Sequence, residues 1–449
     1  MRTRRGRGGT PWPRSAARVG VAALTVPLVL SACGAGGRPD GDSGGAETGV
    51  TDDTITIGAH FPLTGVAAPG YSEIPTGAKA YYDYVNANGG VHGRTIEYVY
   101  RDDAYNPTNT SQVTNELVLR DEIFAMVGGL GTPTHGAVLD FLHDNEVPDL
   151  FVSSGSLLWD QPDTYPMTFG WQSDYEIEGK ILGQYLAEHH SDAKIGLLLQ
   201  DDDFGEDGEK GVRAYVDSQI VSAQRYAPTT NDVTPQVSAL KDAGADVVVG
   251  FTVPSFTALS QLSAQRLDYD PQWVYSNVGS DSALVGSLLS RFSEGAVEDA
   301  SSLEGALTTE YLSGVEDSGD PWVELWQRVW EEHGGDEPLT NYRIYGMAQA
   351  YTFVQTLQAT GPEPTREGLV ETLESSGGEF AGPTLSPFRY SPDSHAGVSG
   401  VRVAEIVGEA TEPLTPVLLT DNGDAEITEQ ESDQAPPPED GIPDAPAGN

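Results

Sequence analysis

Between residue 54 and about residue 420, apolar positions follow two regular spacings in turn. A short apolar run at 55–59 is typical of a buried strand. The next segment spaces its apolar residues by four, three and four positions, as an amphipathic helix does: Ile74, Ala78, Tyr81 and Val85. The turn-forming residues at 88–90, Asn-Gly-Gly, would end this helix. The pattern therefore predicts a strand followed by a helix at the start of the ordered region.

The same alternation of strands and helices repeats along the chain. We expect further strands at 95–100, 123–127, 148–152, 194–199, 245–251 and 272–276. We expect the helices at 111–120, 134–144, 174–189, 206–218, 255–266 and 282–290. Strands joined by helical crossovers pair in parallel, and a parallel sheet is covered by helices on both faces. Because the span of roughly 370 residues exceeds what a single core supports, the pattern predicts an α/β protein with two doubly wound parallel-sheet lobes.

Two turns that follow predicted strands are rich in glycine and hydroxyl residues. They contain Gly131, Thr132, Pro133, Thr134, Ser154, Gly155 and Ser156. The carboxyl ends of parallel strands are where α/β sheets bind ligands. Hydroxyls and backbone N–H groups at helix starts suit a carboxylate or a carbonyl-like group. Capping of the following helices explains the same hydroxyl residues, so the spacing leaves both interpretations open.

Charge and composition exclude several classes of function. The 449 residues include 24 Lys and Arg against 68 Asp and Glu, for a formal net charge of -44. So acidic a surface repels phosphate backbones, which excludes nucleic acid as a partner. The single cysteine excludes an internal disulfide and a multi-cysteine metal site. The eight histidines show no metal-binding spacing, and no G-x-S-x-G motif occurs. We therefore expect no enzymatic activity, no metal and no cofactor.

The two ends of the chain differ from the middle. Residues 1–32 have the pattern of an export signal, with a basic stretch, an apolar run at 19–30 and small residues before Cys33. The segment that ends in Cys33 resembles the bacterial lipobox, which implies cleavage before this cysteine and its acylation. Residues 33–53 are predicted to form a flexible Gly-rich tether, so the protein would be anchored to the outer face of the cell membrane. The acidic, Pro-rich segment 421–449 is predicted to be disordered.

The span from 54 to about 410 resembles the branched-chain amino acid (leucine/isoleucine/valine) type of periplasmic binding protein, which has the type I solute-binding fold. The resemblance rests on segments that occur in this order: Ile55–Gly58, Pro62–Gly65, Asn86–Arg94, Gly131–Thr134, Gly170–Gln172, Glu178–Gly179, Asp202–Gly205 and Gly244–Val248. These segments cover nearly all of the predicted ordered region. Among the members of this family, the chain looks closest to the receptors of ABC importers.

The resemblance implies roles for particular residues. In this family the turns that match 131–134 and 154–156 contact the carboxylate of the ligand. Phe204 matches an aromatic residue that closes from the second lobe and is a tyrosine in many relatives. The loop that includes Tyr71 also reaches the ligand in relatives.

One segment departs from the family pattern. Amino acid binders carry an acid from the second lobe that pairs with the α-ammonium of the ligand. The matching segment 275–279, which includes Val278, has no acid, although Asp281 follows it. This departure leaves the identity of the solute open, because a buried ammonium without a partner is costly.

The resemblance also implies the organisation and the partners of the chain. We expect crossings between the lobes near residues 172, 306 and 384, with 54–172 and 306–384 in lobe I and 173–305 and 385–420 in lobe II. Such a receptor closes its lobes over a small-molecule solute and delivers it to an ABC permease with its ATPase subunits, and we expect it to be a monomer. A ligand-sensing subunit of a signalling system is an alternative. A lipid-anchored hydrolase is another, although no nucleophile beside a base is visible.

Overall fold

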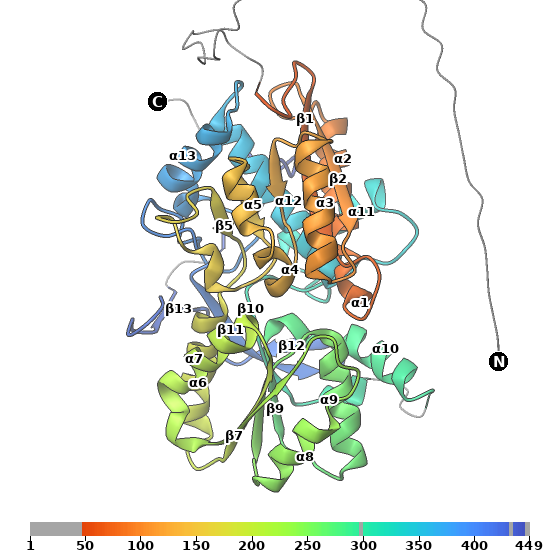
Figure 1. Cartoon of the computed structure of the whole chain (residues 1–449), viewed down its shortest axis with the longest axis vertical. Helices are drawn as coiled ribbons and strands as arrows, with labels where there is room; N and C mark the ends of the chain where they lie inside the picture. The colour runs from red at the N-terminus through yellow and green to blue at the C-terminus, as the bar shows by residue number, and fades with distance from the viewer. Residues whose placement is uncertain (1–46, 296–299, 431–433, 445–449) are drawn as a thin grey trace, which may run out of the picture. The chain divides into compact units, whose positions relative to one another are not determined.

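The structure is a computed structural model that describes residues 47–295, 300–430 and 434–444. The predicted signal peptide, Cys33 and most of the tether lie outside these residues. The described chain contains two sheets, each covered by helices (Figure 1). None of its helices combines the length and the apolar character that crossing a bilayer requires.

The first sheet is parallel throughout, with the strand order β2-β1-β3-β4-β5. Its strands are β1 (Thr54–Phe61), β2 (Thr95–Asp102), β3 (Ala125–Val127), β4 (Asp149–Val152) and β5 (Thr168–Gly170). The helices that join them are α1 (Ala68–Tyr71), α2 (Ile74–Ala87), α3 (Pro107–Leu119), α4 (Thr132–Gly136) and α5 (Leu139–Asp144). We call this sheet and the helices packed on it the first lobe.

The second sheet has nine strands and is mixed, in the order β14-β13-β11-β10-β9-β8-β6-β7, with β12 paired to β11. The parallel strands are β6 (Ile195–Gln200), β7 (Ile220–Tyr226), β8 (Val247–Phe251), β9 (Gln272–Tyr275) and β10 (Leu307–Glu310). The antiparallel additions are β11 (Gly400–Val407), β12 (Ala410–Pro413), β13 (Leu418–Leu419) and β14 (Thr428–Glu429). The helices are α6 (Tyr175–His189), α7 (Asp203–Val216), α8 (Thr234–Asp242), α9 (Pro254–Arg266) and α10 (Ser282–Phe292). This sheet and its helices form the second lobe.

The two α/β lobes confirm the fold predicted from the sequence. Central strands β6 and β8 are buried along their whole length, as expected for parallel strands with helices on both faces. The predicted helix at 134–144 is two short helices, α4 and α5, separated by Ala137 and Val138. The antiparallel strands after residue 400 were not predicted.

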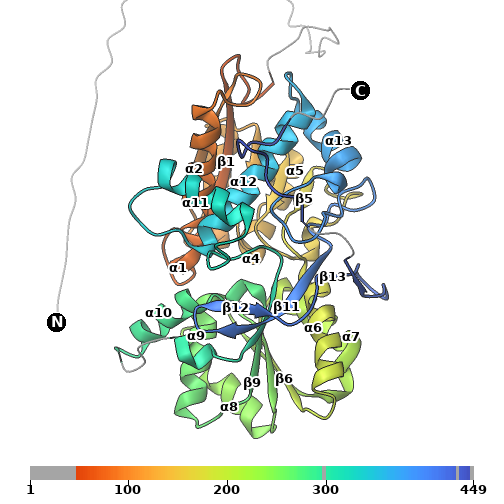
Figure 2. The ribbon, with the colours of Figure 1, turned by 180° about the vertical axis from the view of Figure 1, so that it is seen from behind.

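Three helices that follow β10 return to the first lobe: α11 (Pro321–His333), α12 (Asn341–Thr360) and α13 (Arg366–Ser376). Helices α11 and α12 pack against α2, which Figure 2 shows from behind. The backbones of α2 and α12 approach so closely that position 77 requires glycine, because a β-carbon there would lie 2.1 Å from the carbonyl oxygen of Arg343. The tryptophans at every fourth position of α11, Trp322, Trp326 and Trp330, are all buried.

The chain crosses between the lobes at places that differ in part from those predicted. Strand β10 pairs with β9 and β11, so the second sheet continues past residue 306 to residue 310. Residues after 385 were expected in the second lobe, but His395 stacks on Phe169 of β5, and its carbonyl accepts a hydrogen bond from Gly170. Periodicity did not reveal these two boundaries because neither segment contains a helix.

The segment predicted to be disordered is held against the fold in its described residues. The ammonium of Lys180 donates hydrogen bonds to the carbonyls of Asp421 and Ala425. Farther along, the hydroxyls of Tyr81 and Tyr84 on α2 donate to the carbonyls of Gly441 and Asp440. Composition could not reveal these contacts, because the groups of the segment that accept the hydrogen bonds are its peptide carbonyls, which every sequence carries.

Candidate ligand-binding site

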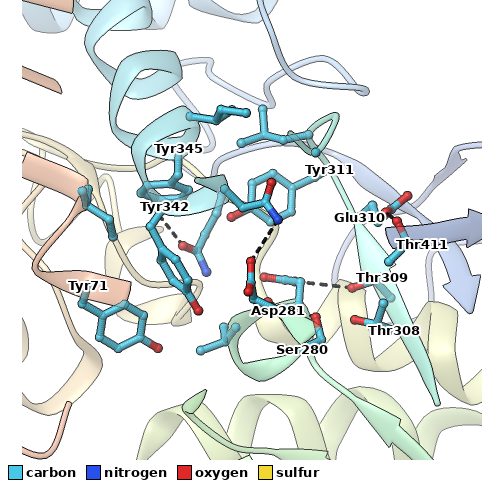
Figure 3. Close-up of a pocket in the computed structure, with 18 of the residues that line it drawn as sticks. Tyr71, Ser280, Asp281, Thr308, Thr309, Glu310, Tyr311, Tyr342, Tyr345 and Thr411 are labelled. Atoms are coloured by element: carbon cyan, nitrogen blue, oxygen red, sulfur yellow. Dashed lines mark hydrogen bonds between the residues drawn. The ribbon is translucent and has the colours of Figure 1, made fainter. Parts of the chain in front are cut away.

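A cavity lies between the two lobes and is lined by residues of both (Figure 3). Its empty volume is about 1330 Å³, which includes space open to solvent. The segments that follow most of the parallel strands contribute to its lining, as expected at the carboxyl edge of such sheets. The contributing residues include Tyr105 after β2, Thr132 after β3, Ser153 after β4, Gln172 after β5, Phe204 after β6, Asn277 after β9 and Tyr311 after β10.

The structure brings half of the sequence-predicted ligand-binding residues to this cavity. Those that line it are Tyr71, Gly131, Thr132, Phe204 and Val278. Those that do not are Pro133, Thr134, Ser154, Gly155 and Ser156. The second group lies behind the lining, and its contacts show what each hydroxyl does instead.

Thr132 carries the hydroxyl of the first turn that reaches the cavity. Its oxygen lies 2.7 Å from that of Ser154, which also accepts a 3.4 Å hydrogen bond from the hydroxyl of Tyr175. Thr134, in contrast, is fully buried and donates to the carbonyl of Leu130. One hydroxyl of this turn therefore faces the cavity, while the other closes the turn. At Gly131, φ is +103°, which favours glycine, and a β-carbon there would lie 2.4 Å from the Thr134 hydroxyl.

Ser156 belongs to a contact between the lobes. Its hydroxyl donates to Asp207 on α7 at 3.2 Å, and the backbone N–H of Leu157 donates to the same carboxylate oxygen at 3.0 Å. Burial raises the pKa of Asp207 to about 6, although these hydrogen bonds lower it in part. A carboxylate of the second lobe thus holds the loop of the first lobe that follows β4.

Two further hydrogen bonds join the lobes elsewhere along the cavity. The side-chain amide of Asn341, at the start of α12, donates to Asp281 at 2.9 Å. The hydroxyl of Ser255 on α9 donates to the carbonyl of Val66 at 2.8 Å. Together with the Asp207 contact, these bonds make direct lobe-to-lobe contacts around the solvent-filled space. Segment 275–279 itself has no acid, but Asp281 follows it. The carboxylate of Asp281 accepts a hydrogen bond from the N–H of Leu284, which caps α10, and another from Asn341 of the first lobe.

The sequence pattern did not indicate the carboxylate that orders the second-lobe wall of the cavity. Glu178 on α6 is fully buried and does not line the cavity. Its carboxylate accepts from the backbone N–H and the side-chain amide of Asn277, both at 2.8 Å, and from Thr309 at 2.6 Å. Burial raises the pKa of Glu178, and the four hydrogen bonds to its carboxylate oppose that rise. Because Glu178 precedes Asn277 by 99 residues, no local spacing indicates this pairing.

Most of the aromatic residues that line the cavity were not predicted from the sequence either. Six tyrosines line the cavity, of which only Tyr71 was predicted: Tyr71, Tyr105, Tyr175, Tyr311, Tyr342 and Tyr345. Tyr311 follows the end of β10, so the rule that found the first two turns would have found it had this strand been recognised. Tyr342 and Tyr345 lie near the start of α12, which follows helix α11 and not a strand, so the rule for strand ends does not apply to them.

A buried chain of polar side chains lies behind the first-lobe loops. His60 Nδ1 lies 2.8 Å from Asp103, His60 Nε2 lies 2.8 Å from His135 Nδ1, and His135 Nε2 lies 2.8 Å from Asp149. Asp103 also accepts a hydrogen bond from the backbone N–H of Tyr105, which lines the cavity. Burial lowers the pKa of His60. These hydrogen-bonded side chains connect the loop after β2, which carries Asp103, to α4 after β3, which carries His135.

The lining of the cavity is acidic. It includes Asp281, Glu310, Glu316, Asp317 and Glu409, and within the described residues it includes no Lys, Arg or His. Glu310 has its own partners, Arg402 and Thr411, whereas Glu316 and Glu409 are exposed. In the described ranges, no group of three His, Cys, Asp or Glu side chains is arranged to hold a metal ion. The cavity therefore offers hydroxyls, amides and carboxylates, but no fixed positive charge.

Comparisons with known proteins agree with this architecture. A sequence model described as periplasmic binding protein matches residues 54–411. Leu/Ile/Val-binding protein homolog 2 of Brucella abortus is 25% identical over 205 residues, which are 43% of this chain and 53% of that protein. The chain thus matches about half the length of this relative.

Two solved structures share the fold. One is a fatty acid ABC transporter substrate-binding protein from Thermomonospora curvata, with a TM-score of 0.71 and 21% identity, covering 85% of this chain and 96% of that one. The other is a branched chain amino acid ABC transporter protein from Thermus thermophilus with bound valine, with a TM-score of 0.70 and 19% identity, covering 82% and 97%. At these identities, the likeness establishes the fold alone.

Proposed function

The chain belongs to the periplasmic binding protein family, as its resemblance to the leucine/isoleucine/valine type implied, and we propose that it is an extracytoplasmic receptor for a small polar or carboxylate-bearing solute. A branched-chain amino acid or a related compound is the class that the family favours. The observation that supports this most strongly is the cavity between the lobes, to which the loops after most of the parallel strands contribute. The arrangement supports binding and release rather than turnover.

Closure of the lobes is the proposed mechanism of capture. Asp207 meets the N–H of Leu157, and Asn341 meets Asp281, only when the lobes lie together. A solute that contacts both walls adds its own bonds to these and shifts the equilibrium toward the closed state. The permease of an ABC importer would then recognise the closed lobes.

The polar groups of the cavity support a solute with a carboxylate and a balancing positive charge. Thr132 offers a hydroxyl on the first-lobe wall, and Ser154 orients it. The absence of basic residues in the described lining disfavours a solute that carries only negative charge, because its carboxylate would meet five acids without compensation. An ammonium group on the same solute removes this penalty. We therefore favour an amino acid or a similar zwitterion over a simple organic acid.

A thermal-shift screen of amino acids, amides and aromatic acids tests the receptor function. A ligand that binds only the folded protein raises its apparent stability by about 2.7 kcal/mol at a hundredfold excess over the dissociation constant. We expect a reproducible rise in Tm with at least one zwitterionic solute. A flat response to every compound, or turnover of esters, amides or glycosides, would speak against a receptor.

Anchoring through Cys33 is a separate part of the proposal. We expect acylation of this cysteine to hold the protein at the outer face of the cell membrane, beside the permease and ATPase subunits of an importer. Labelling cells with a fatty acid analogue should mark the protein, and Cys33→Ser should abolish the label and release the protein. Loss of solute uptake on deletion of the gene would support the importer, whereas unchanged uptake with a lost response to the solute would favour the sensor.

A further inference from the structure

The walls of the cavity carry tyrosines whose hydroxyls have no hydrogen-bond partner in the described protein. Tyr71 and Tyr311 are only 7% and 8% exposed, and both line the cavity, as does Tyr342. Within the described residues, none of these three hydroxyls makes a hydrogen bond to the protein. Tyr345 and Tyr175 differ, because their hydroxyls donate to Gln172 and to Ser154.

The three tyrosines come from separate elements and face the same space. Tyr71 ends α1, Tyr342 begins α12, and their rings meet edge to face with centroids 5.9 Å apart. Tyr311 follows β10 and packs edge to face on the buried Trp171 at 6.2 Å. Figure 3 shows Tyr71 and Tyr342 on one side of the pocket and Tyr311 on another. These ring contacts position the three tyrosines in the lining of the cavity.

From these hydroxyls we infer that the solute carries a hydrogen-bonding group on its side chain, and that this group is uncharged or cationic. The inference rests on the proposed receptor function and narrows its class of ligand. A leucine, isoleucine or valine side chain would displace water from the tyrosine hydroxyls and offer them nothing in return. Each hydroxyl that a bound solute covers and leaves without a partner costs roughly fivefold to 150-fold in affinity. A site that hydrogen-bonds its substrate rejects the apolar analogue for this reason.

The charge of the lining excludes a carboxylate as that side-chain group. The cavity contains five acids and, in its described residues, no basic side chain. Asp281 and Asn341 lie at the lobe-to-lobe contact near Tyr342, so an anionic side chain there would face a carboxylate. A hydroxyl, a carboxamide or an ammonium donates to phenol oxygens and carboxylates alike. The structure thus points to an amino acid with a donor-bearing side chain, or a solute of the same chemistry.

Isothermal titration of the purified protein with matched solutes tests this inference. The pairs are leucine and asparagine, phenylalanine and tyrosine, and glutamate and glutamine, chosen because the members of each pair are similar in size. We expect the donor-bearing member of at least one of the first two pairs to bind ten times more tightly than its apolar counterpart, and glutamine to bind more tightly than glutamate. Tighter binding of leucine, isoleucine or valine than of every donor-bearing solute would overturn the inference and leave the receptor function intact. Binding of none of these compounds would contradict the inference, whereas the thermal-shift screen decides the receptor function separately.

Three conservative variants assign the effect to the tyrosines. Tyr71→Phe, Tyr311→Phe and Tyr342→Phe each remove one oxygen and keep the ring. At least one of these variants should reduce the preference for the donor-bearing solute threefold or more, without weakening the binding of its apolar counterpart. Tyr215→Phe is the matched control, because this tyrosine is 39% exposed on α7 and does not line the cavity. An unchanged preference in all three variants would show that these hydroxyls do not select the solute.

Discussion

The hydroxyl oxygen of Thr132 lies 2.7 Å from that of Ser154, so the residue that reaches the cavity is oriented by one that does not. The two turns that carry them follow neighbouring strands, β3 and β4, of the first sheet. In the proposed site, Ser154 would act on a solute through Thr132. Ser156, by contrast, acts on the contact between the lobes.

Substitutions in these turns should separate the two roles. We expect Thr132→Val to weaken solute binding at least tenfold, or about 1.4 kcal/mol, because it removes the hydroxyl but keeps the shape of the side chain. The double variant Ser154→Ala/Ser156→Ala should also lose at least tenfold, through orientation and closure together. Isothermal titration measures both effects, with the exposed Ser375→Ala as a control. Unchanged affinity in Thr132→Val would remove this residue from the site.

Asp207 should make the stability of the protein depend on pH. Burial raises its pKa from 3.8 to about 6, so the folded protein binds this proton more tightly than the unfolded chain does. The contribution of Asp207 to stability is therefore fully present below about pH 4 and is lost as the pH rises through about 6. Asp207→Asn keeps an acceptor for the Leu157 N–H but does not titrate. The Tm of this variant minus that of the parent should increase from pH 4 to pH 7, and a constant or falling difference would contradict the account.

The buried histidine chain should stabilise the first lobe. Three contacts of 2.8 Å join His60 and His135 to each other and to the carboxylates of Asp103 and Asp149. His135→Phe keeps an aromatic ring but leaves His60 Nε2 and the Asp149 carboxylate without these partners, so we expect it to lower the free energy of unfolding by about 1–3 kcal/mol. Urea unfolding measures the loss, with the exposed His143→Phe as a control. Equal stability of the two variants would contradict a stabilising role of the chain.

Lys180 should hold the segment after residue 420 in place. Its ammonium is buried and donates to Thr420, Asp421 and Ala425. Lys180→Met would leave these acceptors unsatisfied, at a cost of about 1–3 kcal/mol, and would expose the segment to protease. Lys79→Met is the control, because Lys79 is half-exposed and pairs with Asp83 on the same helix. Equal melting temperatures and equal cleavage for the two variants would contradict the anchoring role.

The apolar spacing along the sequence predicted those helices and strands whose pattern is contained within a short segment. Strand β1 and helix α2 were predictable because their apolar spacing is visible within a dozen residues. The turn at 131–134 was predictable because it follows a strand end, and Thr132 does line the cavity. The pairing of Glu178 with Asn277 was not predictable, because burial brings together residues 99 positions apart. The tyrosines of α12 were missed for the same reason, since only the return of this helix to the first lobe places them at the cavity.

A crystal structure of the protein with the solute that binds most tightly in the thermal-shift screen tests most directly whether a solute is captured between the lobes. We expect a single molecule there, with a polar group within hydrogen-bond distance of Thr132 and its other end among Tyr71, Tyr311 and Tyr342. Asp207 should then remain in contact with the loop after β4. A solute bound elsewhere, or lobes that hold it without contact to Thr132 or to any of these tyrosines, would contradict the account.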